Sequence, residues 1–182
     1  MKNQHSVHRK KTIVLVSMVM MLCMAACQRN IDTPTLSCPE MMMTGTVQNT
    51  TRSMNLSTST LFRQQLDSGG VKFLSIEAVS DSFKLVLNLM DGPYGDHAIG
   101  NDSLKLKTYV YSQARRLQGG LVVAAINNSA DFNYLRTDTS SITITFINTK
   151  LKKVSGNFYF EAENHKVTGS GTFQNACYVT LP

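Results

Sequence analysis

The chain has 182 residues, four cysteines, no tryptophan and a formal net charge of +6, from 18 Lys and Arg against 12 Asp and Glu. This length fits one domain that buries a core without help from a metal ion. The basic residues form no stripe interleaved with aromatic side chains, so the composition argues against a nucleic-acid-binding protein.

The first 27 residues have the layout of an export signal. Basic residues come first, an apolar run follows over residues 12–22, and small residues stand just before Cys27. The basic residues are Lys2, Arg9, Lys10 and Lys11. This order is typical of a secretory signal. The apolar run is shorter than the roughly 18 residues expected of a spanning helix, which favours cleavage over a retained membrane anchor.

The end of this segment, Met24-Ala25-Ala26-Cys27, resembles the lipobox of bacterial lipoproteins, with methionine where leucine is commonest. The resemblance implies a signal peptide over residues 1–26, a lipid on Cys27 and contact with a membrane through that lipid. Gln28, rather than an aspartate, follows the cysteine. We therefore expect a cell-envelope protein anchored in the outer membrane, with the leaflet left open.

Residues 27–39 are expected to be the lipidated cysteine and a flexible tether, because they contain Pro34 and Pro39 and show no hydrophobic period. A single β domain should then cover residues 40–182. Cys38 precedes its first strand and Cys177 lies in its last strand. An oxidising envelope permits a disulfide between them. The sequence leaves a bridge and two free thiols as nearly equal alternatives.

The segment after Glu40 shows the alternation of half-buried strands. Inward-facing side chains are expected at Phe83, Leu85, Leu87 and Leu89; at Leu104, Leu106, Thr108 and Val110; at Ile142, Ile144 and Phe146; and at Phe158, Phe160 and Ala162. Turn sequences rich in Gly, Asn and Asp separate these runs. A short helix is expected over Ser59 to Asp67, with a simple turn as the alternative. The predicted fold is an antiparallel β-sandwich or partly open barrel with at most one short helix.

Residues that carry chemistry are few, and each has a simpler explanation. Ser170 lies between two glycines inside a strand pattern rather than on the strand-to-helix turn of a serine hydrolase. Asp91, Asp96 and His97 fit a polar turn better than the three or four ligands of a zinc site. Glu161 and Glu163 fit a solvated strand end. We therefore expect no catalytic residue, no metal and no cofactor.

Tyrosines near the turn at residues 91–100 are the candidate ligand-binding residues. Tyr94, Tyr109 and Tyr111, with His97, offer amphipathic rings that can stack on a sugar or a peptide. Tyrosines that only cover a sheet face are the simpler alternative. Ser103, in Asp102-Ser103-Leu104, resembles a short O-glycosylation site of related bacteria, although an unmodified turn serine is the default.

The C-terminal third carries a family resemblance. Residues 153–162, KVSGNFYFEA, and residues 166–173, KVTGSGTF, resemble the closing hairpin of small Bacteroidetes-type lipoproteins of unknown function. The resemblance implies an antiparallel β fold and an envelope location, and it brings no catalytic residues. We expect a binding or assembly module whose ligand is an envelope protein or a glycan. The alternatives are an accessory enzyme of envelope or glycan metabolism and a structural or inhibitory lipoprotein that contacts another envelope protein.

Overall fold

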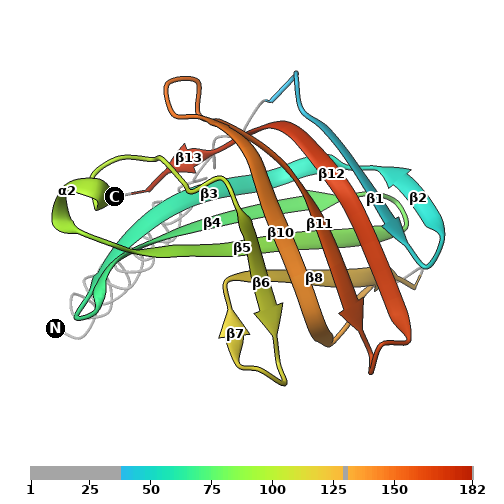
Figure 1. Cartoon of the computed structure of the whole chain (residues 1–182). Helices are drawn as coiled ribbons and strands as arrows, with labels where there is room; N and C mark the ends of the chain where they lie inside the picture. The colour runs from blue at the N-terminus through green and yellow to red at the C-terminus, as the bar shows by residue number, and fades with distance from the viewer. Residues whose placement is uncertain (1–37, 129–130, 182) are drawn as a thin grey trace, which may run out of the picture. The chain divides into compact units, whose positions relative to one another are not determined.

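The computed structural model describes residues 38–128 and 131–181, and two β-sheets face each other in this part of the chain (Figure 1). The first has seven strands, in the order β2 (Thr50–Ser53), β1 (Met42–Val47), β12 (Val167–Cys177), β11 (Lys153–Ala162), β10 (Thr137–Asn148), β6 (Thr108–Ser112) and β7 (Leu117–Gln118). The second has six, in the order β13 (Val179–Thr180), β3 (Asn55–Leu66), β4 (Gly69–Val79), β5 (Phe83–Tyr94), β8 (Gly120–Asn127) and β9 (Phe132–Tyr134).

Strand pairs in both sheets are antiparallel, except that β13 runs parallel to β3. The all-β prediction is confirmed, and the sandwich is the arrangement found. The expected signal peptide over residues 1–26, the lipidation site Cys27 and residues 28–37 of the expected tether lie outside the described residues.

The strands of the seven-stranded sheet run across those of the six-stranded sheet in Figure 1. Such crossed sheets are joined at corners where the chain passes from one sheet to the other. One corner lies at Gly119, which accepts a hydrogen bond from Met90 N of β5 at 2.8 Å and donates one to Val110 O of β6 at 2.9 Å. The next residue is Gly120, where a Cβ atom would overlap the Tyr109 carbonyl. A side chain is therefore excluded where the sheets meet.

The hydrophobic core fills the space between the two sheets. The six-stranded sheet contributes Leu61, Leu74, Ile76, Leu85, Leu87 and Val122, and the seven-stranded sheet contributes Ile142, Ile144, Val154, Phe158, Phe160 and Phe173. Each of these side chains is at most 3 % exposed. The alternation predicted for residues 83–89 and for residues 158–162 is confirmed.

The prediction of a helix over Ser59 to Asp67 is wrong, because Ser59 to Leu66 belong to strand β3 and Asp67 lies in the turn that follows. Leu61 is buried in the core, and its neighbour Phe62 lies on the opposite face and stacks on Phe73 of β4. Register pairing with β4 continues to Leu66. Apolar residues spaced as on one face of a helix also occur in a strand that has apolar residues on both faces. Here the pairing with β4 makes the segment a strand.

Four inward-facing assignments, in two of the predicted runs, are also wrong. Leu106, Thr108 and Val110 are exposed, because strand β6 begins only at Thr108 and its inward residue is Tyr109; Leu104 of the same run is buried as expected. In β10, Phe146 is 48 % exposed, because a bulge between Ile144 and Phe146 shifts the inward position to Ile147. Side-chain alternation cannot reveal such an inserted residue.

Helix α2 (Asp96–Ile99) is a single turn between β5 and β6. Within the part of the chain that the structure describes, no helix has the length and hydropathy needed to cross a membrane.

Candidate functional site

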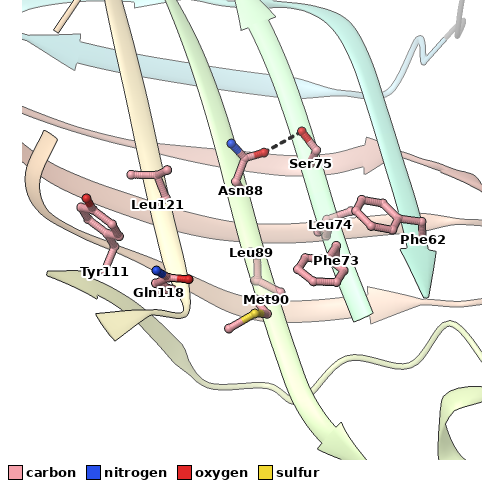
Figure 2. A pocket seen from close by; sticks show the side chains of 10 residues that line it. All are labelled: Phe62, Phe73, Leu74, Ser75, Asn88, Leu89, Met90, Tyr111, Gln118 and Leu121. Atoms are coloured by element: carbon pink, nitrogen blue, oxygen red, sulfur yellow. Dashed lines mark hydrogen bonds between the residues drawn. The ribbon is translucent and has the colours of Figure 1, made fainter. Parts of the chain in front are cut away.

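A hollow of about 340 Å³ lies against the six-stranded sheet and is open to solvent (Figure 2). Its lining comprises Phe62, Phe73, Leu74, Ser75, Asn88, Leu89, Met90, Tyr111, Gln118 and Leu121. These residues come from β3, β4, β5 and β8, with one residue each from β6 and β7. Ligand pockets commonly have volumes of about 300–1,000 Å³ and a mostly apolar lining. The hollow is therefore large enough for a small ligand or for one side chain of a partner.

Strand register explains why apolar side chains gather here. Phe62 of β3 lies opposite Phe73 of β4, which lies opposite Met90 of β5. The next outward row pairs Ser75 with Asn88, and Asn88 with Leu121 of β8. These residues alternate with inward-facing core residues, so they occupy the face that points away from the seven-stranded sheet. In a sandwich this outer face is expected to be polar, and here four of these six outward residues are apolar.

The two phenylalanine rings stack on each other at one side of the hollow. Their centroids are 4.7 Å apart and their planes differ by 13°. Figure 2 shows Phe62 and Phe73 beside each other, with Met90 between Phe73 and the Gln118 side of the hollow. Methionine adapts its shape to what it contacts. One side of the hollow is thus rigid and the other is adaptable.

The polar groups of the hollow are neutral and partly unpaired. Ser75 Oγ donates a hydrogen bond of 2.8 Å to Asn88 Oδ1, and this bond fixes the Asn88 amide (Figure 2). Within the described residues, the Asn88 amide nitrogen, the Gln118 amide and the Tyr111 hydroxyl have no side-chain hydrogen-bond partner in the protein. None of the ten described lining residues is charged. The site therefore offers hydrogen bonds without a charge.

A second cluster of polar residues lies between the sheets, beneath the segment 95–107. Lys72 and Asp91 are fully buried side chains on adjacent strands of the six-stranded sheet. Lys72 Nζ donates to Asn101 Oδ1 at 3.1 Å and to Ser103 O at 2.8 Å. It also lies 4.2 Å from the centroid of the Tyr94 ring. Burial lowers the pKa of Lys72 below its usual value, although nearby carboxylates act in the opposite direction.

Asp91 organises the other half of this cluster. Its carboxylate accepts hydrogen bonds from the Tyr94 hydroxyl and, at 2.9 Å, from Lys105 N. Tyr109 donates from its hydroxyl to Lys105 O at 2.7 Å. Burial, together with the Asp91 charge, raises the pKa values of Tyr94 and Tyr109 well above the usual range of a phenol. Both tyrosines therefore remain hydrogen-bond donors at any physiological pH.

Asp102 joins the segment to both sheets. Its carboxylate, 3 % exposed, pairs with Arg63 of β3 and with Lys152, and it accepts a hydrogen bond of 2.7 Å from the Thr180 hydroxyl. Burial by itself would raise the pKa of Asp102, but these hydrogen bonds outweigh it and lower the pKa. Burial and the Asp102 charge raise the pKa of the neighbouring Tyr178 to about 12. The cluster fastens the segment 95–107 over the end of the sandwich.

The candidate ligand-binding residues are not brought together. Tyr94 and Tyr109 belong to the buried polar cluster, and His97 is exposed on α2. Tyr111 lines the hollow. Ser103 is exposed, and its hydroxyl donates to Asn101 Oδ1. Within the described residues, no three His, Cys, Asp or Glu side chains gather as a metal site requires.

Of the remaining sequence candidates, Ser170 and Cys177 lie in β12 of the seven-stranded sheet, and Cys38 precedes β1. Cys38 and Cys177 are joined by a disulfide, with a sequence separation of 139 residues. Ser170 is exposed in the middle of β12, and the inward-facing Gly169 and Gly171 flank it beneath the rings of phenylalanines on β11. Packing thus accounts for the glycines on both sides of the serine.

Sequence reasoning missed the hollow, although a signal for it was present. Val86 and Met90 are apolar residues at outward positions of the strand that starts at Phe83, and Phe73 is one at an outward position of β4. Apolar residues on both faces of a strand indicate that both faces are covered or that one is a binding surface. The gathering of Phe62, Phe73 and Asn88 required the strand order and register.

The two crossed sheets and the hollow define the class of this protein, which is an all-β sandwich domain with an apolar recess on the outer face of one sheet. The chain belongs to the DUF6252 family, described as a domain of unknown function, whose model matches residues 46–182. The expectation of a family without an assigned function is thereby confirmed. No curated protein and no solved structure shows a significant match to the chain.

Proposed function

We propose that this protein is a lipid-anchored envelope lipoprotein of the Bacteroidetes type, and that its β domain binds a ligand in the hollow of the six-stranded sheet. The lipobox at Met24–Cys27 and the resemblance of the C-terminal hairpin support the anchor and the location. The ligand-sized apolar hollow supports binding.

A single observation carries the proposal of a binding module. An apolar recess lined by Phe62, Phe73, Met90 and Leu121 remains open on a face where a sandwich normally places polar side chains. Keeping these groups in water costs roughly 25 cal/mol for each Å² of apolar surface, and a ligand that covers them recovers this free energy. The side chains of the buried polar cluster, in contrast, mostly bond to one another and to the segment 95–107, and among the described residues only Arg63 Nε, Asp91 Oδ1 and Tyr178 Oη of this cluster are buried without a hydrogen-bond partner.

The test compares two exposed phenylalanines. Phe62 lines the hollow at 36 % exposure, whereas Phe146 is 48 % exposed on the other sheet. The full-length protein in detergent is titrated with N-phenyl-1-naphthylamine, a neutral probe that fluoresces in apolar sites. Wild type and Phe146→Ala should bind the probe saturably and equally, and Phe62→Ala should bind it at least fivefold more weakly.

Partition of the probe into detergent is common to all three proteins, so only the difference between them reports on the hollow. Thermal melting of each variant shows that the fold is retained. Equal loss of binding in both phenylalanine variants, or no saturable binding by the wild type, would contradict the proposal.

A further inference from the structure

The lining of the hollow excludes a charged ligand. The ten described lining residues carry no charge, and the Lys84–Glu77 pair on the same face is satisfied internally at 2.7 Å. A carboxylate or ammonium group that entered the hollow would lose water and gain no opposite charge. The electrostatics of the site therefore favour a neutral ligand.

The polar pair among these apolar residues excludes a purely aliphatic ligand. Asn88 is held by its bond to Ser75, and its amide nitrogen has no partner in the described part of the protein. A hydrocarbon placed over Asn88 would remove water from that N–H group and leave it unsatisfied. A ligand with an oxygen at this position replaces the lost water, so the site selects for a hydrogen-bond acceptor.

The aromatic pair in the hollow favours a ligand that contains a ring. Phe62 and Phe73 are stacked and both line the hollow, so they offer rigid aromatic surface there, and Met90 and Leu121 provide apolar contacts nearby. Tyr111 and Gln118 stand at one side with further hydrogen-bonding groups. An apolar ring can stack or pack edge to face on such an aromatic pair, and it loses less conformational freedom on binding than a flexible chain does.

We infer that the hollow takes an uncharged small molecule with an apolar ring and an oxygen atom that accepts a hydrogen bond from Asn88. This inference rests on the proposed function, because it assigns the ligand class of the same site. A hydrocarbon chain of a membrane lipid has neither the ring nor the acceptor oxygen, and a charged sugar acid is neither uncharged nor built on an apolar ring.

Three probes that share one ring system test the inference on the full-length protein. They are 1-naphthamide, 1-naphthoate and 1-methylnaphthalene, which differ only in a neutral acceptor, a charged group and a methyl group. We expect 1-naphthamide to bind about tenfold more tightly than either of the others, which corresponds to about 1.4 kcal/mol.

The Asn88→Leu variant should lose about tenfold in affinity for 1-naphthamide and gain affinity for 1-methylnaphthalene. Asn157→Leu is the matched control, because Asn157 is an exposed asparagine in the other sheet, and it should bind all three probes as the wild type does. Melting curves verify that both variants fold.

The outcomes separate this inference from the proposed function. If no probe binds saturably, or if binding is unaffected by Phe62→Ala, the hollow is not a binding site and both fail. If binding depends on Phe62 but 1-naphthoate binds as well as 1-naphthamide, or if Asn88→Leu changes nothing, the hollow remains a binding site and the ligand class is overturned.

Discussion

Glycines opposite phenylalanines determine how β11 and β12 pack in the seven-stranded sheet. Phe158 lies opposite Gly171 and Phe160 opposite Gly169, and each ring covers the glycine across from it. The same pairing occurs once with the glycine on β11 and the phenylalanine on β12, where Gly156 lies opposite Phe173. A glycine in a strand often marks such a close approach. The rings thus occupy the space that side chains would need.

Replacing Gly171 with alanine should destabilise the protein. A Cβ atom there would overlap the Thr44 carbonyl and lie 2.5 Å from Phe158 Cζ. Overpacking of this kind costs about 1–3 kcal/mol. Ser170→Ala, next to it but exposed, should change stability by less than about 0.5 kcal/mol. Urea denaturation of both variants measures the difference, and equal midpoints would refute this account.

The carboxylate of Asp102 should make stability depend on pH in the acid range. Its pKa is lowered in the folded protein, so the unfolded chain binds more protons and stability rises with pH through this range. The contribution is present above the unfolded pKa of about 3.9 and is lost as pH falls through the folded value. At pH 7, the free energy of unfolding of Asp102→Asn should be about 1.5–3 kcal/mol lower than that of the wild type, a loss typical of hydrogen bonds to a charged group.

Chemical denaturation from pH 2 to pH 7 follows this effect, because the loss occurs below the unfolded pKa. The stability curves of the wild type and Asp102→Asn should converge as the pH falls. Asp131→Asn serves as the control because Asp131 is exposed. A constant gap between the wild type and Asp102→Asn across the whole range would show that the charge on Asp102 is not what stabilises the cluster.

At the scale of elements, the sequence predicted most strands and their inward faces. Alternation identified the inward residues of β5 and β11, because each of these strands keeps one apolar face to the core over the predicted run. It failed in β10 because the bulge at Phe146 adds a residue. It failed after Leu104 in the run 104–110 because buried side chains hold residues 101–107 in an irregular path, so that Tyr109 rather than Thr108 or Val110 faces the core. Long-range contacts decide both cases.

The disulfide ties the start of the β unit to the end of β12. It joins residues 139 apart, and in the chain-entropy model a loop of this length contributes on the order of 5 kcal/mol to stability. The double variant Cys38→Ser/Cys177→Ser should therefore unfold at much lower urea concentration. Dithiothreitol should lower the urea midpoint of the wild type to that of the double variant, and it should leave the midpoint of the double variant unchanged. If dithiothreitol makes both thiols reactive but leaves the stability of the wild type unchanged, this prediction is contradicted.

At the scale of the whole molecule, the candidate site depends on features that strand patterns do not specify. Tyr111 was predicted as a ligand-binding residue and lies in the hollow, but Phe62 and Phe73 were not, because one was assigned to a helix and the other lay outside the alternating runs. The sequence specifies which residues are apolar. Only the order β3-β4-β5-β8 and the corner at Gly119 bring them to one surface.

The proposed lipid anchor and the β unit should be separable. The core and the hollow are built from residues between Met43 and Tyr178, so removing the lipid should not change their stability. Cys27→Ala should lose its acyl mass and its recovery with the outer membrane, while its melting temperature and its Phe62-dependent probe binding stay as in the wild type. Intact-mass measurement and membrane fractionation test the anchor, and protease treatment of whole cells shows which side the hollow faces. If Cys27→Ala still fractionates with the outer membrane as the wild type does, the lipoprotein assignment fails, whereas binding in the hollow can still be measured.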